Sequence, residues 1–338
     1  MHMPNELLSL PIAGGSFAIA FTSLGLICRS ATKTIVQDKI ILMGIFGAFI
    51  FAAQMINFPL PLGPSGHMTG SVFLAIVFGP AAAAVVMTSV VVVQCLIFQD
   101  GGLLALGCNI INLAIIPSYL GFTIYTFLSG PDLQKKRVYA AAIIASIVST
   151  VAASAMVSIE AFISGVLSIP FITFLSTLCG IHFVIGIVEG AITAALLLYL
   201  RQSRPDVILG TGDLKPAVKM PAFIATVSIA VIICGTCLSL FASEKPDGLE
   251  YSLVTEHSGQ EISIIENDAH AVPVANDLQA KISPLPDYTR RADINAVNEP
   301  AKGWTSFAAV VGSILTMLAV WIISKAAKPK EAPQCTMP

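Results

Sequence analysis

The sequence predicts an all-α, polytopic integral membrane protein in which a seven-span module is followed by a two-span hairpin. Composition, the length of the apolar runs and the placement of the basic residues predict this fold class. Of the 338 residues, 55% are hydrophobic and 11% are charged, and the mean hydropathy is +0.83. Soluble domains carry about a quarter charged residues, which excludes a soluble enzyme. The net charge of −2 provides no basic surface for nucleic acid.

Apolar runs long enough to cross a bilayer, about 20 residues each, predict the helices. We expect spans at 11–28, 40–57, 81–98, 103–128, 138–164, 171–200, 221–241 and 304–323. A further apolar run, 66–79, ends at Gly79-Pro80 and reaches only about 21 Å as a helix. It is therefore a tilted short helix, a half-helix or a re-entrant segment. We count it as a crossing because of where the basic residues lie.

The basic residues support nine crossings with the N-terminus outside and the C-terminus in the cytoplasm. The cytoplasmic segments are then 29–39, the turn at 79–80, 129–137, 201–219 and the tail after 324. These segments hold most of the 18 basic residues, and the short outer loops hold none. The other basic residues all lie in 244–303, which is too long for the positive-inside rule to apply. We expect a multi-pass protein of the plasma or inner cell membrane.

The chain divides into three regions by composition. They are the seven-span module, 1–200, a basic cytoplasmic linker, 201–219, and the two-span hairpin, 220–338. The hairpin encloses 244–303, which is rich in Asp and Glu and has scattered prolines and little helical periodicity. These features predict an external acidic loop that is partly disordered.

The opening dipeptide, Met1-His2, is a candidate metal chelate. A histidine in the second position offers the terminal amine, its own backbone nitrogen once deprotonated, and imidazole Nδ1. These three nitrogens lie in one plane and leave one in-plane position open, a geometry that Ni(II) and Cu(II) favour. The alternative interpretation is a polar residue at a frayed terminus.

His67 is the candidate for the fourth ligand. It lies in a loop rich in Pro and Gly, 59–70, on the same predicted outer face as Met1. Such a loop is rigid and can hold one imidazole toward the chain start, with Ser65 as a supporting residue. The alternative is a helix-capping or headgroup-level histidine. Asp100 and Asn109 carry polar groups near the same outer mouth and are candidates to orient His67, with packing or capping as the alternative.

Two ionisable residues, His182 and Glu189, lie near the middle of the span at 171–200. Their spacing puts both on one side of a helix, about 10 Å apart along the axis. Ionisable groups at membrane depth are costly and suggest function. We leave four interpretations open: a proton relay, a second metal site, a coupling contact, or a structural polar tie between helices.

Several catalytic motifs are absent from the sequence. It contains neither the phosphate loop G-x-x-x-x-G-K-[ST] nor H-E-x-x-H, the motif of zinc proteases. We therefore expect no ATP hydrolysis by this chain itself and assign no catalytic residues.

Several stretches together resemble a known family. They are Met1-His2, the loop with Ser65-Gly66-His67, Phe78 to Ala82, Gln94 to Asn109, and His182 to Thr193. They resemble the substrate-binding (S) component of energy-coupling-factor nickel/cobalt transporters, the NikM/CbiM type. The stretch 241–251 is similar to the small N subunit of the same transporters, NikN/CbiN, here fused to the C-terminus.

The resemblance implies a protein that captures Ni(II), or Co(II), from outside and carries it inward. It implies metal ligands at Met1, His2 and His67, and no cofactor beyond the transported metal. The implied partners are a transmembrane coupling protein and cytoplasmic ATPases, in addition to the lipid bilayer. A planar nitrogen site places Ni(II) before Co(II), and we expect no enzyme activity.

Other functions remain as alternatives. One is a proton-coupled metal carrier that works without an ATPase. Another is a metal channel, in which a half-helix at 66–79 would be a filter element. The third is an intramembrane enzyme that uses His182 and Glu189.

Overall fold

The protein is a bundle of helices, as the apolar runs predict. The structure is a computed structural model that describes residues 2–34, 39–61, 63–130, 135–209, 215–243, 245–253, 271–290 and 303–326. Met1 lies outside the described residues, and so does half of the acidic segment 244–303. The predicted fold class, an all-α polytopic membrane protein with a seven-span module and a two-span hairpin, is confirmed.

The elements follow one another in the order that the apolar runs predict. The module contains η1 (Asn5–Leu7), α1 (Leu10–Thr34), α2 (Ile40–Gln54), β1 (Phe58–Pro59), β2 (Ser65–Gly66), α3 (Ser71–Phe78), α4 (Pro80–Phe98), α5 (Leu106–Asn109), η3 (Ile110–Ile115), α6 (Ile116–Ser129), α7 (Lys135–Ile163) and α8 (Phe171–Ser203). The linker and hairpin contain η4 (Pro205–Val207), α9 (Met220–Ile232), η5 (Ile233–Cys237), η6 (Leu238–Phe241), α10 (Gly248–Leu253), α11 (Ala271–Ile282), η7 (Pro286–Tyr288) and α12 (Gly303–Ala326). The π-helix η3 joins α5 to α6, and η5 and η6 continue α9.

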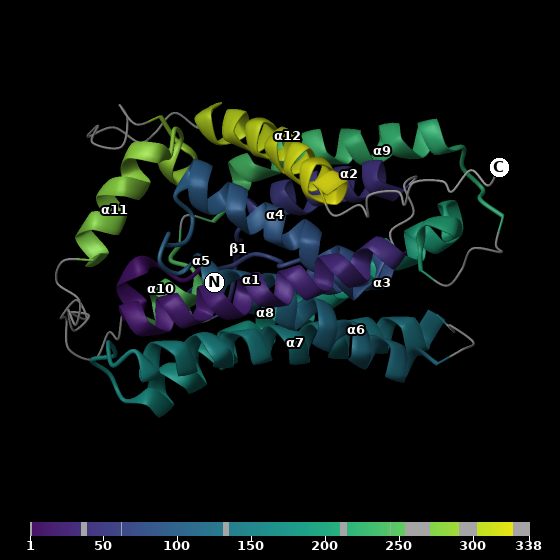
Figure 1. The fold of residues 1–338 in the computed structure, drawn as a ribbon. Helices are drawn as coiled ribbons and strands as arrows, with labels where there is room; N and C mark the ends of the chain where they lie inside the picture. The colour runs from purple at the N-terminus through teal and green to yellow at the C-terminus, as the bar shows by residue number, and fades with distance from the viewer. Residues whose placement is uncertain are drawn as a thin grey trace, which may run out of the picture.

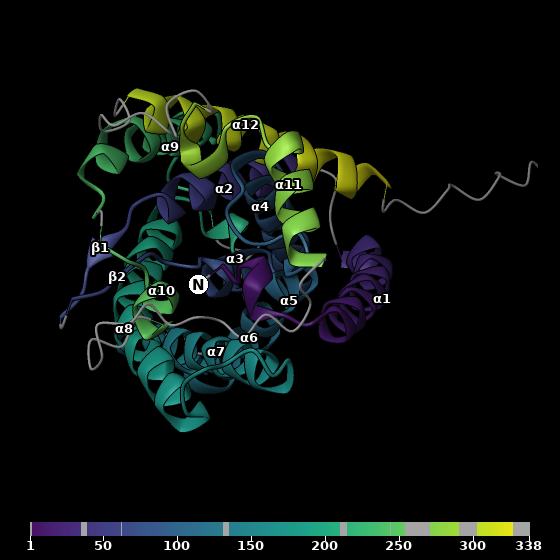
Figure 2. The ribbon, with the colours of Figure 1, turned by 90° about the vertical axis from the view of Figure 1, so that its left-hand side faces the viewer.

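The long helices run side by side in two groups. Figure 1 shows α6, α7 and α8 in one group and α2, α4, α9 and α12 in the other. In the view along the bundle, α1 stands at the edge and α3 lies between the groups (Figure 2). The short helix α3 packs against α4 and α6, and all its residues are buried. It is therefore surrounded by protein rather than lipid.

Two of the nine predicted crossings are shorter than a bilayer. Seven helical rods among the described residues are long and apolar enough to cross a membrane. Helix α2 has 15 residues and α3 has 8, which correspond to about 22 Å and about 12 Å. Of the run 66–79, only Ser71–Phe78 is helical. Of the three alternatives given for this run, the structure therefore agrees with the half-helix.

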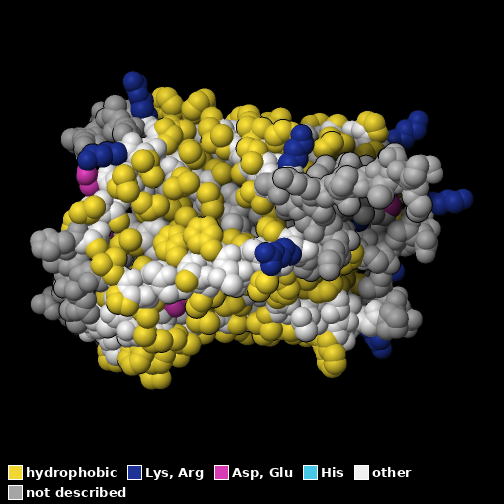
Figure 3. Space-filling view, viewed as in Figure 1, with side chains coloured by type: hydrophobic (Ala, Val, Ile, Leu, Met, Phe, Trp, Pro, Cys, Tyr) yellow, Lys and Arg dark blue, Asp and Glu magenta, His cyan; other side chains and the backbone are white. Residues whose placement is uncertain are grey.

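The outer surface of the bundle suits a lipid environment. Figure 3 shows a broad apolar face, with Lys and Arg mostly over its middle and right-hand side and a few at the upper left. Large apolar side chains point outward from several helices, among them Phe21 on α1, Phe162 on α7 and Ile172 on α8. Contiguous apolar surface of this extent is rare on soluble monomers, and contact with lipid tails explains it.

Two glycines allow α7 and α8 to lie in direct backbone contact. A Cβ at Gly186 would lie 2.7 Å from the Cα of Ile147, and one at Gly190 would lie 2.5 Å from the Cα of Ile143. Small residues one turn apart let helix backbones approach closely in membranes, where packing drives association. This contact holds α8 against α7. Helix α8 carries His182 and Glu189, the two ionisable residues expected at membrane depth.

The hairpin packs on the module through α12, which lies along α2. The described parts of the acidic segment are mainly helical and form α10, α11 and η7. The expectation of little helical structure there is therefore wrong for Gly248–Leu253 and Ala271–Ile282. Helix α11 buries Ala275 and Gln279 against the module, and such docking stabilises short helices that are marginal in water.

The variant Gly186→Ala tests the packing of α7 on α8. The added methyl group meets the backbone of α7, and such overpacking costs about 1–3 kcal/mol. We expect a lower melting temperature for the detergent-solubilised chain, followed by circular dichroism. Gly180→Ala on the same helix is the matched control, because nothing lies within 4 Å of a Cβ there. Equal melting temperatures for the two variants would contradict the close approach.

Candidate metal site

The His67 loop, residues 55–70, connects α2 to α3. Strands β1 and β2 pair in antiparallel fashion, with Phe58 opposite Gly66, and fold the loop into a narrow strand–turn–strand structure. The N–H of Leu60 donates to the carbonyl of Pro64 at 2.8 Å and closes its tip. The local Pro and Gly residues favour this tight turn. The loop therefore presents His67 from a short, ordered pair of strands.

Glu189 holds the end of the His67 loop. Its carboxylate accepts the N–H of Thr69 at 2.9 Å, the hydroxyl of Thr69 at 2.7 Å and the N–H of Gly70 at 3.0 Å. Glu189 is 0% exposed, so these bonds replace water for an extended stretch inside the bundle. Gly70 has a φ of 81° and packs against Ile50, where the chain turns into α3. Glu189 thus acts as a tie between α8 and the loop.

The ring of His67 offers one nitrogen for a ligand. Its Nδ1 lies 3.1 Å from the carbonyl oxygen of Met68, and a carbonyl can only accept. Nδ1 therefore carries the proton and Nε2 keeps its lone pair. Burial, together with the nearby charge of His2, lowers the pKa of His67 to about 3. The ring is thus neutral at physiological pH, the form in which imidazole binds metals.

His2 lies beside His67, as predicted. The two rings are stacked, with centroids 5.7 Å apart and planes inclined by 17°. His2 Nδ1 lies 3.1 Å from Asp100 Oδ1, and Nε2 lies 3.1 Å from Gln94 Oε1. The side chain of His2 is 6% exposed. The structure therefore brings together two of the predicted metal ligands and places both inside the protein.

Asn109 bonds the first residues of the chain, not His67. Its Oδ1 accepts the N–H of Met3 at 2.8 Å, and its Nδ2 donates to the carbonyl of Met3 at 3.1 Å. The N–H of Gly102 donates to the same carbonyl at 2.9 Å. Asn109 orients the segment that carries His2, so its supporting role differs from the predicted contact with His67.

Asp100 contacts both His2 and Tyr288. Its Oδ2 accepts the hydroxyl of Tyr288 at 2.5 Å. Burial by itself would raise the pKa of Asp100, but the charge and hydrogen bond of His2 and the hydroxyl of Tyr288 hold it well below its usual range. Burial and the Asp100 charge raise the pKa of Tyr288, so its phenol stays protonated and donates. Asp100 is thus a carboxylate beside the imidazole pair.

The hairpin lies directly against the His67 loop. The N–H of Ser65 donates to the carbonyl of Pro246 at 2.8 Å, and its hydroxyl donates to the carbonyl of Lys245 at 2.7 Å. Asp247 and Glu250 then form a capping box at the start of α10. Asp247 Oδ1 accepts the N–H of Glu250 at 2.8 Å, and Glu250 Oε2 accepts the N–H of Asp247 at 3.0 Å. Ser65 therefore supports the loop through the hairpin.

His182 lies at the same contact and not beside Glu189. Its Nδ1 lies 2.8 Å from the carbonyl oxygen of Leu178, and a Cβ at Gly248 would lie 3.1 Å from its Cε1. Among the hydrogen bonds of the described residues, none joins His182 to Glu189. Each has its own partner, which favours the coupling contact and the structural tie among the four interpretations.

Helix α11 covers the loop that carries Asp100. Gln279 Nε2 donates to the carbonyls of Cys95 and Gly101 at 3.0 and 2.7 Å, and its Oε1 accepts the N–H of Leu103 at 3.0 Å. Gln279 is 1% exposed. The external part of the hairpin therefore takes part in the wall of the site, which the sequence did not reveal.

A cavity of about 500 Å³ adjoins the two imidazoles. His2, His67 and Tyr288 line it, and so do Lys245 and the acidic residues Asp100, Asp247, Glu250 and Asp287. This excess of carboxyl groups favours a cation. Within the described ranges, no three His, Cys, Asp or Glu side chains are grouped closely enough to hold a metal ion. Met1, a predicted ligand, lies outside those ranges.

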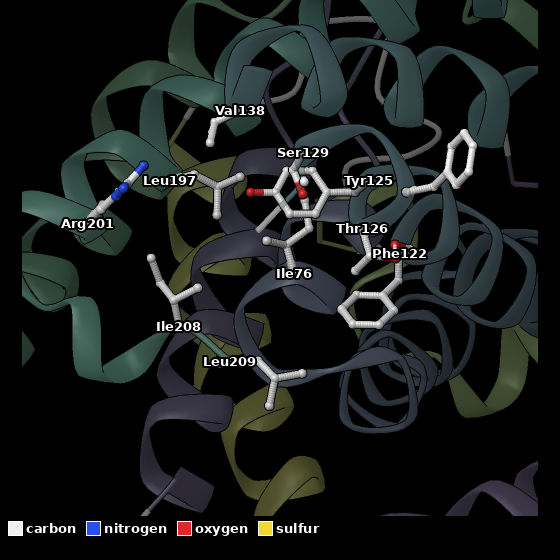
Figure 4. A pocket seen from close by; sticks show the side chains of 12 residues that line it. Ile76, Phe122, Tyr125, Thr126, Ser129, Val138, Leu197, Arg201, Ile208 and Leu209 are labelled. Carbon is white, nitrogen blue, oxygen red and sulfur yellow. Dashed lines mark hydrogen bonds between the residues drawn. The ribbon is translucent and has the colours of Figure 1, made fainter. Parts of the chain in front are cut away.

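A second cavity of about 500 Å³ lies toward the other end of α3. Figure 4 shows Tyr125 and Ser129 of α6, Arg201 of α8 and Leu209 of the linker around it. Its described lining includes no His, Cys, Asp or Glu. It offers no ligands for a metal ion, so the cavity beside His2 and His67 is the candidate metal site.

Sequence reasoning missed several residues of this site. Gln94 contacts His2, Gln54 contacts Gln94, and Tyr288 contacts Asp100. The two glutamines were visible as polar residues inside apolar runs, which are costly unless they are paired. Tyr288 gave no signal, because it lies in the segment that we predicted to be partly disordered.

The fold and the site define a polytopic membrane protein with a buried imidazole pair, and comparison places it in a family. Residues 2–207 match CbiM, the cobalt uptake substrate-specific transmembrane region, and residues 221–329 match the PDGLE domain. The chain belongs to the CbiM family. The letters of the second domain's name are Pro246 to Glu250, the residues that meet Ser65 and cap α10.

Relatives and a solved structure agree with this assignment. The chain is 32% identical over 328 residues to a protein of Archaeoglobus fulgidus assigned as a fused nickel transport protein, NikMN, covering 97% of this chain and 99% of the relative. It is 32% identical over 223 residues to a protein of Haloquadratum walsbyi assigned to metal transport, covering 65% and 100%. A crystal structure of a truncated transition metal transporter matches with a TM-score of 0.52 at 29% identity, covering 59% of this chain and 98% of that one.

These findings confirm the resemblance to a substrate-binding component with a fused N-subunit-like region. The families and relatives are transporters, so the prediction that the chain is not an enzyme is confirmed. The chain is a multi-pass membrane protein of metal transport.

The variant Glu189→Gln separates a loop tie from a proton relay. The amide keeps the size of the side chain but turns an NH₂ group toward the donors of Thr69 and Gly70, and a buried donor left unpaired costs about 1–3 kcal/mol. We expect lower thermal stability and weaker binding of Ni(II), measured by competition with a chelator. Glu160→Gln, on α7 and bonded to Asn112, is the control for a buried carboxyl away from the loop. Unchanged binding with lost transport would instead support the relay.

Proposed function

We propose that the chain captures Ni(II) from outside the cell and carries it inward as the substrate-binding component of an ATP-driven energy-coupling-factor transporter. The observation that carries the proposal is the stacked pair of His2 and His67. His67 has Nδ1 beside an acceptor of the protein and can give Nε2 to a metal. Both nitrogens of His2 lie beside acceptors, Nε2 beside Gln94 and Nδ1 beside Asp100, so Nδ1 must leave Asp100 to bind a metal. The acidic cavity beside them supports a cation as cargo.

The proposed ligands are four nitrogens. They are the terminal amine of Met1, the backbone nitrogen of His2, His2 Nδ1 and His67 Nε2. The proposal takes Met1 as the first residue of the mature chain, which intact-mass measurement tests. His2 Nδ1 leaves Asp100 when it binds the metal, and the Asp100 carboxylate then stays close to the bound cation. A site built from backbone and terminal nitrogens agrees with the lack of a cluster of ligand side chains in the described part.

The ligand set supports Ni(II) as the first cargo and Co(II) as the second. A planar field of nitrogen ligands suits Ni(II) and Cu(II) more than Zn(II) or Mg(II). Cu(II) would bind at least as tightly by intrinsic affinity, so its exclusion falls to supply or kinetics. The nickel transport assigned to the relative of Archaeoglobus fulgidus supports the same order.

The charges support an orientation with the metal site outside and the C-terminus in the cytoplasm. The linker meets the far end of α3, where the N–H of Leu209 donates to the carbonyl of Val77 at 2.9 Å. Lys39, Arg201 and Arg204 lie at this end, and basic residues favour the cytoplasmic side. We propose a transmembrane coupling protein and cytoplasmic ATPases as partners, because the chain has no phosphate-binding motif of its own.

The hairpin supports the metal site in this proposal. It bonds Ser65 at the base of the His67 loop and covers Asp100 with Tyr288. We propose that it holds the site in the arrangement that accepts the metal.

Extending the N-terminus by two residues, Gly-Ser, should abolish high-affinity Ni(II) binding while the protein still folds. The extension converts the amine of Met1 into an amide and removes a ligand. His2→Ala and His67→Ala should also weaken binding at least about 100-fold, at the upper end of losses seen near metal sites. His257→Ala and His270→Ala, which lie outside the described residues, are the controls and should leave the Kd unchanged. Normal nickel binding by the extended chain would contradict the proposed chelate.

Reconstitution into liposomes tests the coupling to ATP. The isolated chain should bind radioactive nickel but should not accumulate it under a metal gradient or a proton gradient. Uptake should require the coupling protein, the ATPases and ATP together. Uptake driven by the metal gradient alone would support a channel, and uptake driven by protons alone would support a carrier.

A further inference from the structure

The cavity of Figure 4 lies toward the end of α3 that is opposite the His67 loop. It has a volume of about 500 Å³ and is lined by α6, α7, α8 and the linker, together with Ile76 of α3. Cavities of about 300–1,000 Å³ with apolar walls and a few polar groups are typical of ligand sites. The metal-site proposal uses none of these residues, so the cavity calls for a separate explanation.

The walls of this cavity are mainly apolar. Phe122 of α6, Val138 of α7 and Leu197 of α8 line it. The cavity opens to the outside of the bundle, because Phe127 and Leu209 also line it and are 84% and 48% exposed. Such side chains are unfavourable beside water and favourable beside hydrocarbon. The walls and the mouth therefore suit a hydrocarbon chain that enters from the membrane.

Basic groups adjoin the apolar walls. Arg201 of α8 lines the cavity, and Figure 4 shows the Tyr125 hydroxyl directed toward the side where Leu197 and Arg201 lie. Arg137 of α7 is close by, since a Cβ at Gly130, another lining residue, would lie 3.0 Å from its Nη1. The described lining includes no carboxyl group. Two guanidinium groups in such surroundings favour an anion, and arginine matches the geometry of phosphate.

The basic groups lie at the depth of lipid headgroups. Helix α8 has 33 residues, about 50 Å, and so exceeds the hydrocarbon core of about 30 Å. Arg201 is in its last turn, and Arg137 is in the first turn of α7. Long basic side chains at such positions reach the membrane surface. Leu197 lies about one turn before Arg201, and Phe122 about two turns before Gly130, so the apolar walls lie deeper.

We propose that this cavity binds one anionic phospholipid, with an acyl chain against Phe122 and Leu197 and the phosphate beside Arg201 and Arg137. Basic pockets between membrane helices bind lipid headgroups through the same combination of charge and apolar surface. The inference goes beyond the proposed function and does not depend on it. It requires only that this end of the bundle lies at a membrane surface, on either side.

Photoaffinity labelling of the full chain in lipid nanodiscs tests the site. The probe is phosphatidylglycerol with a diazirine group in one acyl chain, and phosphatidylcholine with the same chain is the comparison. Label on α3 is diagnostic, because all residues of α3 are buried and bulk lipid does not reach them. We expect the phosphatidylglycerol probe to label α3 and the phosphatidylcholine probe to label it much less. Inorganic phosphate should not displace the label.

Two variants test the two halves of the site. Arg201→Gln should raise the fraction of phosphatidylglycerol needed for half-maximal labelling by about 5-fold, the ratio that one basic residue near a lipid surface contributes. Thr126→Trp places a ring at an exposed position of the lining and should block labelling, which gives a second test if Arg201→Gln is unstable. Arg29→Gln is the matched control, because Arg29 is an exposed arginine of α1 outside the lining.

The outcomes separate a lipid from other occupants. Equal labelling of α3 by the two probes would overturn the proposal, and so would unchanged labelling in either variant or an equal loss in Arg29→Gln. Displacement by inorganic phosphate would indicate a site for a soluble anion instead. No label on α3, with a cross-link from Thr126 to the coupling protein, would overturn it in favour of protein docking. Ni(II) binding is measured separately and should be unchanged in all three variants, so failure of the metal-site proposal would leave this result standing.

Discussion

A buried carboxylate, Glu189, is the contact on which the rest of the site depends. It accepts the backbone N–H groups of Thr69 and Gly70 where the chain is not helical and lies among the helices of the bundle. Such groups cannot be left without partners at this depth. Because Gly186 and Gly190 hold α8 directly against α7, the carboxylate is itself held in place. The His67 loop can therefore pass into the bundle and end in a helix of only 8 residues.

Segments from both ends of the chain meet around this loop. The first residues enter beside it and are held by Asn109, and the hairpin approaches from the other side through Pro246 and Tyr288. Either segment alone would leave part of the site without support. The first residues supply His2 to the histidine pair, and the hairpin supplies the hydroxyl of Tyr288 that bonds Asp100. This arrangement explains why a region resembling a separate small subunit is useful when it is fused to the same chain.

The sequence predicts the helices better than it predicts the hydrogen bonds of the site. The span expected at 171–200 is observed as Phe171–Ser203, because bilayer thickness sets the length of an apolar run. His2 and His67 were found from position and loop chemistry, and the structure stacks them. The partners of Glu189 and Asn109 were not predictable, because they lie more than a hundred residues away in sequence. Gln54 and Gln94 were visible as polar residues inside apolar runs, which indicates that they are paired but not with which groups.

X-ray absorption at the nickel K-edge, on the purified full chain loaded with one equivalent of Ni(II), tests the central claim most directly. A planar site with only nitrogen ligands is the result that the account predicts, and it should disappear when the N-terminus is extended. A six-coordinate nickel with oxygen ligands, unaffected by the extension, would show that the metal binds elsewhere and would contradict the account.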